Sequence, residues 1–191
     1  MQNLTVSPVD GPVTETERTY AVDLLCTTQT ALHQAVAGLS DAQINYKPAA
    51  DRWSVADCAE HIVLVESSIF QRILAGMDKP NDPDRRAEIK VSDVDVIKAV
   101  RTRTVQIPAP DPFVPTGRFG SLRAAMAAFD EHRETAIAYA ETVTDDLRTH
   151  YFTHFRLGTL DAYQALLLLA SHGERHRKQI EEVKASEGFP A

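Results

Sequence analysis

The sequence is poor in the features that mark disulfide-linked, membrane-spanning and nucleic-acid-binding proteins. It has two cysteines and one tryptophan in 191 residues, and its 27 acidic residues outnumber its 20 lysines and arginines. Its longest apolar run, at 165–170, is far too short to span a bilayer. Because the net charge is −7 and no basic patch stands out, binding through phosphate neutralisation is disfavoured. We therefore expect neither a membrane nor a nucleic-acid partner.

The scarcity of cysteine and of targeting features also sets expectations for the compartment. Residues 1–12 have neither the basic start nor the apolar stretch of a secretory signal, which favours a cytoplasmic protein. Cys26 and Cys58 both lie in apolar stretches with helical spacing. Free cysteine often packs as a small hydrophobic residue, so we expect both thiols to be buried in the core and unpaired.

What the sequence does contain is a set of strong helix signals. Capping residues and apolar spacings of three and four predict long helices over 14–38, 54–74, 121–142 and 159–184. We expect Thr14, Ser54, Ser121 and Thr159 to cap their first turns, and Gly38 and Gly76 to end the first two helices. No convincing alternating strands accompany them, so the pattern predicts an all-α four-helix bundle. Residues 1–13 are expected to be a flexible tail and 14–191 a single domain.

Three connectors separate the predicted helices. Residues 40–53 contain one short turn at Ser40 and Asp41, and residues 145–158 carry two histidines. Residues 77–118 form a long irregular loop broken by six prolines, with a short helix expected at 94–105. A loop of this length in a small domain is often a lid or a substrate wall, although a solvated connector fits the sequence equally well.

The pattern with the most chemical content is a histidine pair. His172 and His176 stand four residues apart in the last predicted helix, so both imidazoles lie on one helix face, and apolar neighbours turn that face inward. His61 lies on an inward stripe of the second helix. Three neutral imidazoles that converge would form a metal site with an open position. The glutamate of H-G-E-R-H is two residues after the first histidine, which excludes the H-E-x-x-H arrangement of zinc proteases.

Two other interpretations of the histidines remain open. Histidines on an apolar face are often hydrogen-bonded core residues that bind no metal, and four further histidines (His33, His132, His150 and His154) compete for any role. Alternatively, a metal only stabilises the bundle of a non-enzymatic stress-response or interaction module. A structural zinc site normally has four protein ligands, and no fourth soft ligand is evident here.

Three stretches resemble the DinB-like (damage-inducible B) family. They are W-S-V-A-D-C-A-E-H at 53–61, L-G-T-L-D-A-Y-Q at 157–164 followed by His172, Arg175, His176, Gln179 and Ile180, and P-T-G-R at 115–118 leading to Arg133. Together the match spans about residues 14–186. The resemblance implies an up-down-down-up bundle, a metal site at His61, His172 and His176, and often a homodimer.

The resemblance also sets expectations for the chemistry. The metal in similar proteins is usually zinc or nickel, and characterised relatives include S-transferases that use the thiols bacillithiol or mycothiol, a mycothiol-dependent maleylpyruvate isomerase and metal hydrolases. We therefore expect a metal-dependent transferase or hydrolase acting on a small molecule, with a low-molecular-weight thiol as one cosubstrate candidate. Catalytic residues beyond the metal ligands are not identifiable from the sequence.

Several further side chains are candidates for contact with the substrate or the metal ligands. Gln179 falls almost one turn beyond His176, and Glu66 about one turn beyond His61, where a solvated charge is the ordinary alternative. The remaining candidates are Tyr163, His150 and His154. Trp53 directly precedes a helix cap, so we expect it to anchor packing rather than to bind substrate.

Overall fold

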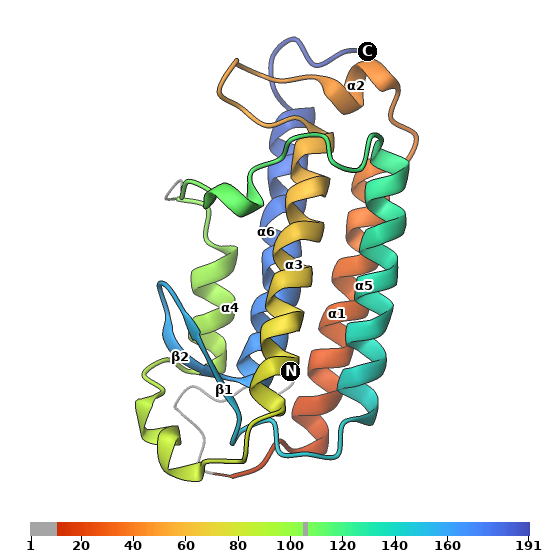
Figure 1. The fold of residues 1–191 in the computed structure, drawn as a ribbon. Helices are drawn as coiled ribbons and strands as arrows, with labels where there is room; N and C mark the ends of the chain where they lie inside the picture. The colour runs from red at the N-terminus through yellow and green to blue at the C-terminus, as the bar shows by residue number, and fades with distance from the viewer. Residues whose placement is uncertain (1–10, 105–106) are drawn as a thin grey trace.

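Four long helices lie side by side in the computed structural model, which describes residues 11–104 and 107–191 (Figure 1). They are α1 (Glu15–Val36), α3 (Val55–Met77), α5 (Leu122–Thr142) and α6 (Ala162–Lys184). In Figure 1, α1 and α6 run upward while α3 and α5 run downward. The four-helix bundle and its up-down-down-up course are therefore confirmed. Most of the expected tail lies outside the described residues, and the single domain over 14–191 stays a prediction.

The caps read from the sequence begin three of the four helices as expected. Thr14 forms a capping box with Glu17 at the start of α1, and Ser54 forms one with Asp57 at the start of α3. Ser121 accepts a hydrogen bond from the first turn of α5. These local bonds satisfy backbone N–H groups that a helix start leaves unpaired, so they can be recognised without tertiary information.

The beginning of α6 differs from the prediction. The expected connector 145–158 contributes β1 (Tyr151–His154), which pairs antiparallel with β2 (Gly158–Asp161). Thr159 lies in β2, and the residue that caps α6 is Asp161, whose side chain accepts a hydrogen bond from the Gln164 backbone N–H. The predicted Thr159 cap was wrong because this segment is extended and satisfies its backbone through the hairpin.

The predicted loop 77–118 is more ordered than its prolines suggested. It contains the short helices η1 (Pro83–Glu88), α4 (Asp93–Arg101) and η2 (Asp111–Phe113), and α4 packs on α6 outside the bundle. The short helix was expected over 94–105, but Thr102 is already extended, and residue 105 lies outside the described residues. The turn expected at Ser40 and Asp41 is the one-turn helix α2 (Asp41–Asn45).

Two smaller expectations also fail. Gly76 lies inside α3 rather than at its end, and a Cβ there would stand 3.1 Å from the carbonyl oxygen of Tyr151, so the glycine allows β1 to approach the helix. Cys58 is buried and free as expected, whereas Cys26 is free but exposed. Cys26 follows the buried Leu25 directly and therefore points away from the face of α1 that packs in the bundle.

The apolar core is divided into two clusters along the bundle. One surrounds Leu25, Ile73 and Leu166, and the other surrounds Leu32 and Ile62. Between them the helices carry a buried polar layer in which Thr28, Glu66 and Arg133 meet. No helix in the described part of the chain is long and apolar enough to cross a membrane.

Candidate metal centre

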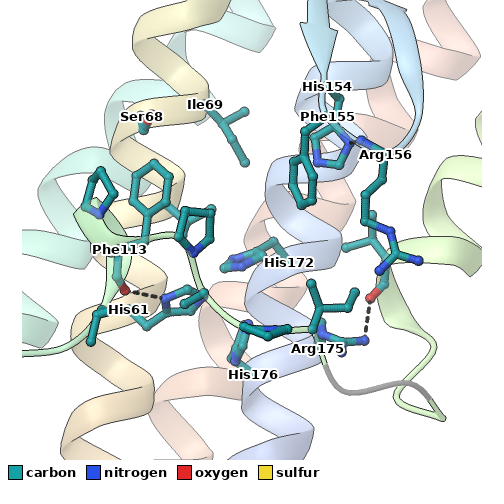
Figure 2. A pocket seen from close by; sticks show the side chains of 18 of the residues that line it. His61, Ser68, Ile69, Phe113, His154, Phe155, Arg156, His172, Arg175 and His176 are labelled. Atoms are coloured by element: carbon teal, nitrogen blue, oxygen red, sulfur yellow. Dashed lines mark hydrogen bonds between the residues drawn. The ribbon is translucent and has the colours of Figure 1, made fainter.

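The structure brings the three predicted histidines together between α3 and α6. His61 on α3 faces His172 and His176 on α6, and one donor nitrogen from each ring lies within 4.8 Å of the others. The ring centroids are 4.4 Å apart for His61 and His176, 4.5 Å for His172 and His176, and 5.1 Å for His61 and His172. Figure 2 shows the rings converging at the wall of a cavity.

Hydrogen bonds fix the orientation of two of the rings. Nδ1 of His61 donates to the backbone carbonyl of Phe113 at 2.7 Å, and Nδ1 of His176 donates to Oε1 of Gln179 at 2.9 Å. Both acceptors are oxygens, so the proton sits on Nδ1 and each Nε2 keeps its lone pair. Nδ1 of His172 is buried and has no hydrogen-bond partner. This pattern of oriented rings and unused nitrogen atoms fits metal ligands.

The electrostatic environment keeps all three imidazoles neutral. Burial lowers the pKa of His61, and lowers the pKa of His172 and His176 well below the ordinary value. The neighbouring histidines lower the pKa values of His172 and His176 further, since a positive charge on one ring disfavours a positive charge on the next. A divalent metal requires the neutral form, and these residues supply it at neutral pH.

A buried glutamate that sequence reasoning missed, Glu60, bonds the loop next to the segment that contacts His61. Glu60 accepts hydrogen bonds from the backbone N–H groups of Thr116 (2.9 Å) and Gly117 (2.8 Å). This anchors the loop that follows η2, and the Phe113 carbonyl in η2 meets His61. In the sequence, Glu60 stands next to His61, and Thr116 and Gly117 belong to the P-T-G-R stretch. Only the folded structure shows that Glu60 and this stretch are hydrogen-bonded to each other.

Of the other predicted site residues, Gln179 lies at the histidine cluster, whereas Tyr163 and Glu66 lie away from the cavity. Gln179 lies at the site as expected, since it binds His176 and also accepts a hydrogen bond from Arg103 at 3.2 Å. Tyr163 does not line the cavity; its hydroxyl donates to the carbonyl of Glu17 inside the bundle. Glu66 does not line it either, and it is not a solvated charge, because it is buried against Arg133.

The cavity beside the histidines has a volume of about 1210 Å³. Its walls come from α3, α4, α6, the hairpin and the segment 107–114, so part of the proline-rich loop forms a cavity wall. Trp53 lines it and packs against His61, with the two ring centroids 4.7 Å apart. His154 also lines the cavity, whereas Nδ1 of His150 donates to the carbonyl of Asp146 away from it.

Comparison with known proteins agrees with the bundle. A model of the DinB superfamily matches residues 24–180. The uncharacterized protein YuaE of Bacillus subtilis (strain 168) is 24% identical over 147 residues, which cover 77% of this chain and 86% of YuaE. YfiT from Bacillus subtilis has a similar fold, with a TM-score of 0.62 and 17% identity over 93% of this chain and 91% of YfiT. YfiT is described as a probable metal-dependent hydrolase with an unusual four-helix bundle topology. Since the superfamily match spans most of its length, this chain belongs to the DinB superfamily.

Proposed function

We propose that His61, His172 and His176 bind one divalent metal ion, zinc or nickel, and that the protein is a metal-dependent enzyme acting on a small molecule. The observation that carries the proposal is the convergence of three neutral imidazoles on a large cavity. Among the described residues, no carboxylate or thiolate joins the group. Three protein ligands and an open position favour catalysis, whereas a structural zinc site closes with a fourth ligand.

The residues around the three histidines would orient the metal ligands and line the cavity. A divalent metal bound by three neutral imidazoles would keep its full charge and acidify a bound water or thiol. The Phe113 carbonyl and Gln179 hold the rings of His61 and His176 so that their Nε2 atoms face the cavity. Trp53 and Phe113 line the same cavity and contribute apolar wall to it.

Hydrolysis is the reaction that we propose first. It needs only an activated water and a bound substrate, and the similarly folded YfiT is described as a probable metal-dependent hydrolase. Transfer of a low-molecular-weight thiol is the second candidate, because a cavity of about 1210 Å³ exceeds the roughly 300–1,000 Å³ of a typical small-ligand pocket and has room for two molecules. Assays with and without added thiol distinguish the two. The homodimer and the cytoplasmic location stay predictions.

Metal analysis of the purified protein tests the site itself. We expect about one divalent ion per chain in the wild type, and loss of that ion in His172→Ala and His176→Ala with helical content retained. His132→Ala, on α5 outside the cavity, is the matched control and should keep the metal. A folded wild-type protein that binds neither zinc nor nickel would contradict the proposal.

Cobalt substitution separates a catalytic from a structural metal. If one coordination position is open, adding azide or a small thiol should change the visible absorption spectrum of the cobalt-loaded protein. An unchanged spectrum at saturating azide and thiol would indicate a closed site. The non-enzymatic alternative, in which the metal only stabilises the bundle, would then be favoured.

A further inference from the structure

The charge of the cavity wall is opposite to that of the chain. The chain has a net charge of −7, yet the described residues that line the cavity include five arginines and one carboxylate, that of Asp51. The five are Arg52, Arg72, Arg103, Arg156 and Arg175. Low-dielectric walls that carry charge of one sign concentrate ligands of the other sign. The cavity as a whole therefore favours an anionic ligand.

Three of these arginines have no hydrogen-bond or ion-pair partner for the guanidinium group among the described residues. Arg103 pairs with Glu182, and Arg175 donates to the carbonyl of Thr102. By contrast, no such partner exists for Arg52, Arg72 and Arg156, and of these three Arg72 and Arg156 are exposed. Arg72 lies on α3 and Arg156 in the turn of the hairpin, so tertiary structure brings them to the same cavity.

His154 lines the same cavity as Arg72 and Arg156 and offers a third hydrogen-bond donor. Its Nδ1 accepts hydrogen bonds from the backbone N–H groups of Arg156 (3.3 Å) and Leu157 (3.2 Å). The ring proton must then lie on Nε2, which makes Nε2–H a donor. Burial, and then the charges of Arg156 and Arg72, lower the pKa of His154 to about 4, so the ring stays neutral. In Figure 2, the side chains of His154 and Arg156 extend from the hairpin into the side of the cavity where His172 lies.

We propose that Arg72, Arg156 and the Nε2–H of His154 form a subsite for an oxyanion, so that the substrate is a small organic carboxylate or phosphate. This inference rests on the proposed function, because it supplies the substrate class for the histidine site. The guanidinium fork matches the geometry of carboxylate and phosphate oxygens.

The subsite lies apart from the histidine cluster, which defines the shape of the ligand. His61, Val65, Ile69 and Arg72 line the cavity along one face of α3. Arg72 is three turns beyond His61, about 16 Å along the helix axis at 1.5 Å per residue. The wall between them includes Val65, Ile69 and Phe113, which suit an apolar middle portion. The anionic group would thus hold one end of the substrate while the other end lies at the histidines.

Fluorescence of Trp53 provides a direct binding assay, because Trp53 is the single tryptophan of the chain and lines the same cavity. The probes are 3-phenylpropionate, phenyl phosphate and the neutral 3-phenylpropionamide. We expect one or both anions to bind, and the amide to bind at least about tenfold more weakly, since charge-assisted hydrogen bonds are the stronger kind. The two anions distinguish a carboxylate subsite from a phosphate subsite. Equal binding of the amide, or no binding of either anion, would overturn the proposal.

Variants then locate the anion. Arg72→Gln/Arg156→Gln should weaken anion binding at least about tenfold, and His154→Phe should weaken it by a smaller factor. Arg123→Gln, at an exposed arginine on α5 outside the cavity, removes one positive charge away from the subsite and should leave binding unaltered. Retained affinity in the double variant would refute the subsite.

The His172→Ala variant separates this proposal from the metal site. If the anion binds at the arginines, this variant should still bind it, even after the metal is lost. If binding disappears, the anion was a metal ligand, which refutes the subsite but supports the histidine site. If metal analysis finds no metal in the wild type while the anions still bind through Arg72 and Arg156, the proposed enzyme fails and the anion site stands.

Discussion

Helix α3 takes part in two buried polar clusters, the histidines that it shares with α6 and an ion pair that it shares with α5, and the two clusters differ in how completely they are satisfied. We call the pair of Glu66 and Arg133 the lock. The Arg133 guanidinium contacts both carboxylate oxygens of Glu66, at 2.6 and 2.8 Å from Nη2, while its Nη1 donates to the Leu25 carbonyl and Thr28 hydroxyl. Nε, Nη1 and Nη2 of Arg133 all donate hydrogen bonds inside the bundle, and neither Arg133 nor Glu66 lines the cavity.

The histidine cluster is the opposite case. Nδ1 of His61 and Nδ1 of His176 are held by the Phe113 carbonyl and Gln179, whereas Nδ1 of His172 is buried without a hydrogen-bond partner among the described residues. Buried polar groups without partners are costly, so they are rarely kept where they serve packing alone. The comparison indicates that the lock stabilises the fold, whereas the histidines are arranged to bind something from the cavity.

The largest expected effect comes from breaking the lock. Glu66→Gln keeps the size of the side chain but leaves the Arg133 charge without an anion, so we expect the free energy of unfolding to fall by about 3–5 kcal/mol. Urea denaturation measures it. Glu181→Gln removes a partly exposed carboxylate from α6 and should cost less than about 1 kcal/mol. If the two variants are equally stable, the ion pair between Glu66 and Arg133 does not stabilise the fold.

Gly173 sets the spacing between the lock and the histidines. A Cβ at this position would lie 2.7 Å from Oε1 of Glu66 and 3.1 Å from Nη2 of Arg133, and the ion pair holds both atoms in place. Alanine normally gains roughly 1 kcal/mol over glycine inside a helix, but overpacking costs about 1–3 kcal/mol. We expect Gly173→Ala to be destabilised by about 1 kcal/mol and to bind metal more weakly. A stabilised variant with unchanged metal affinity would show that α6 adjusts freely.

The smallest effect is expected from removing a histidine in metal-free protein. His172→Leu replaces an unpartnered buried ring with an apolar group, so at pH 8 the free energy of unfolding should change by less than about 1 kcal/mol. Below pH 6.5 the variant should become the more stable protein. The folded-state pKa of His172 is depressed, so the wild type loses stability as pH falls and the unfolded chain takes up the proton. Denaturation of both proteins between pH 5 and 8 measures this; a wild type that gains stability toward pH 5 would contradict it.

The sequence predicted the local parts of this structure well because their physics is local. Thr14 and Ser54 cap their helices through partners three residues away, and His172 and His176 share a face because a helix turns every 3.6 residues. The hairpin at 151–161 escaped prediction because two strands of four residues carry too little periodicity to be distinguished from a loop.

Residue type and spacing alone determined the bundle, the capped helix starts and the histidine pair, since each follows from contacts within a few turns. Only the tertiary structure decided what the isolated side chains do. It paired Glu66 with Arg133 and placed Glu60 behind the loop that orients His61. It also brought Arg72 and Arg156 to one cavity. These pairings join residues far apart in the chain, and burial, which sets their charge states and energies, exists only once the helices have packed.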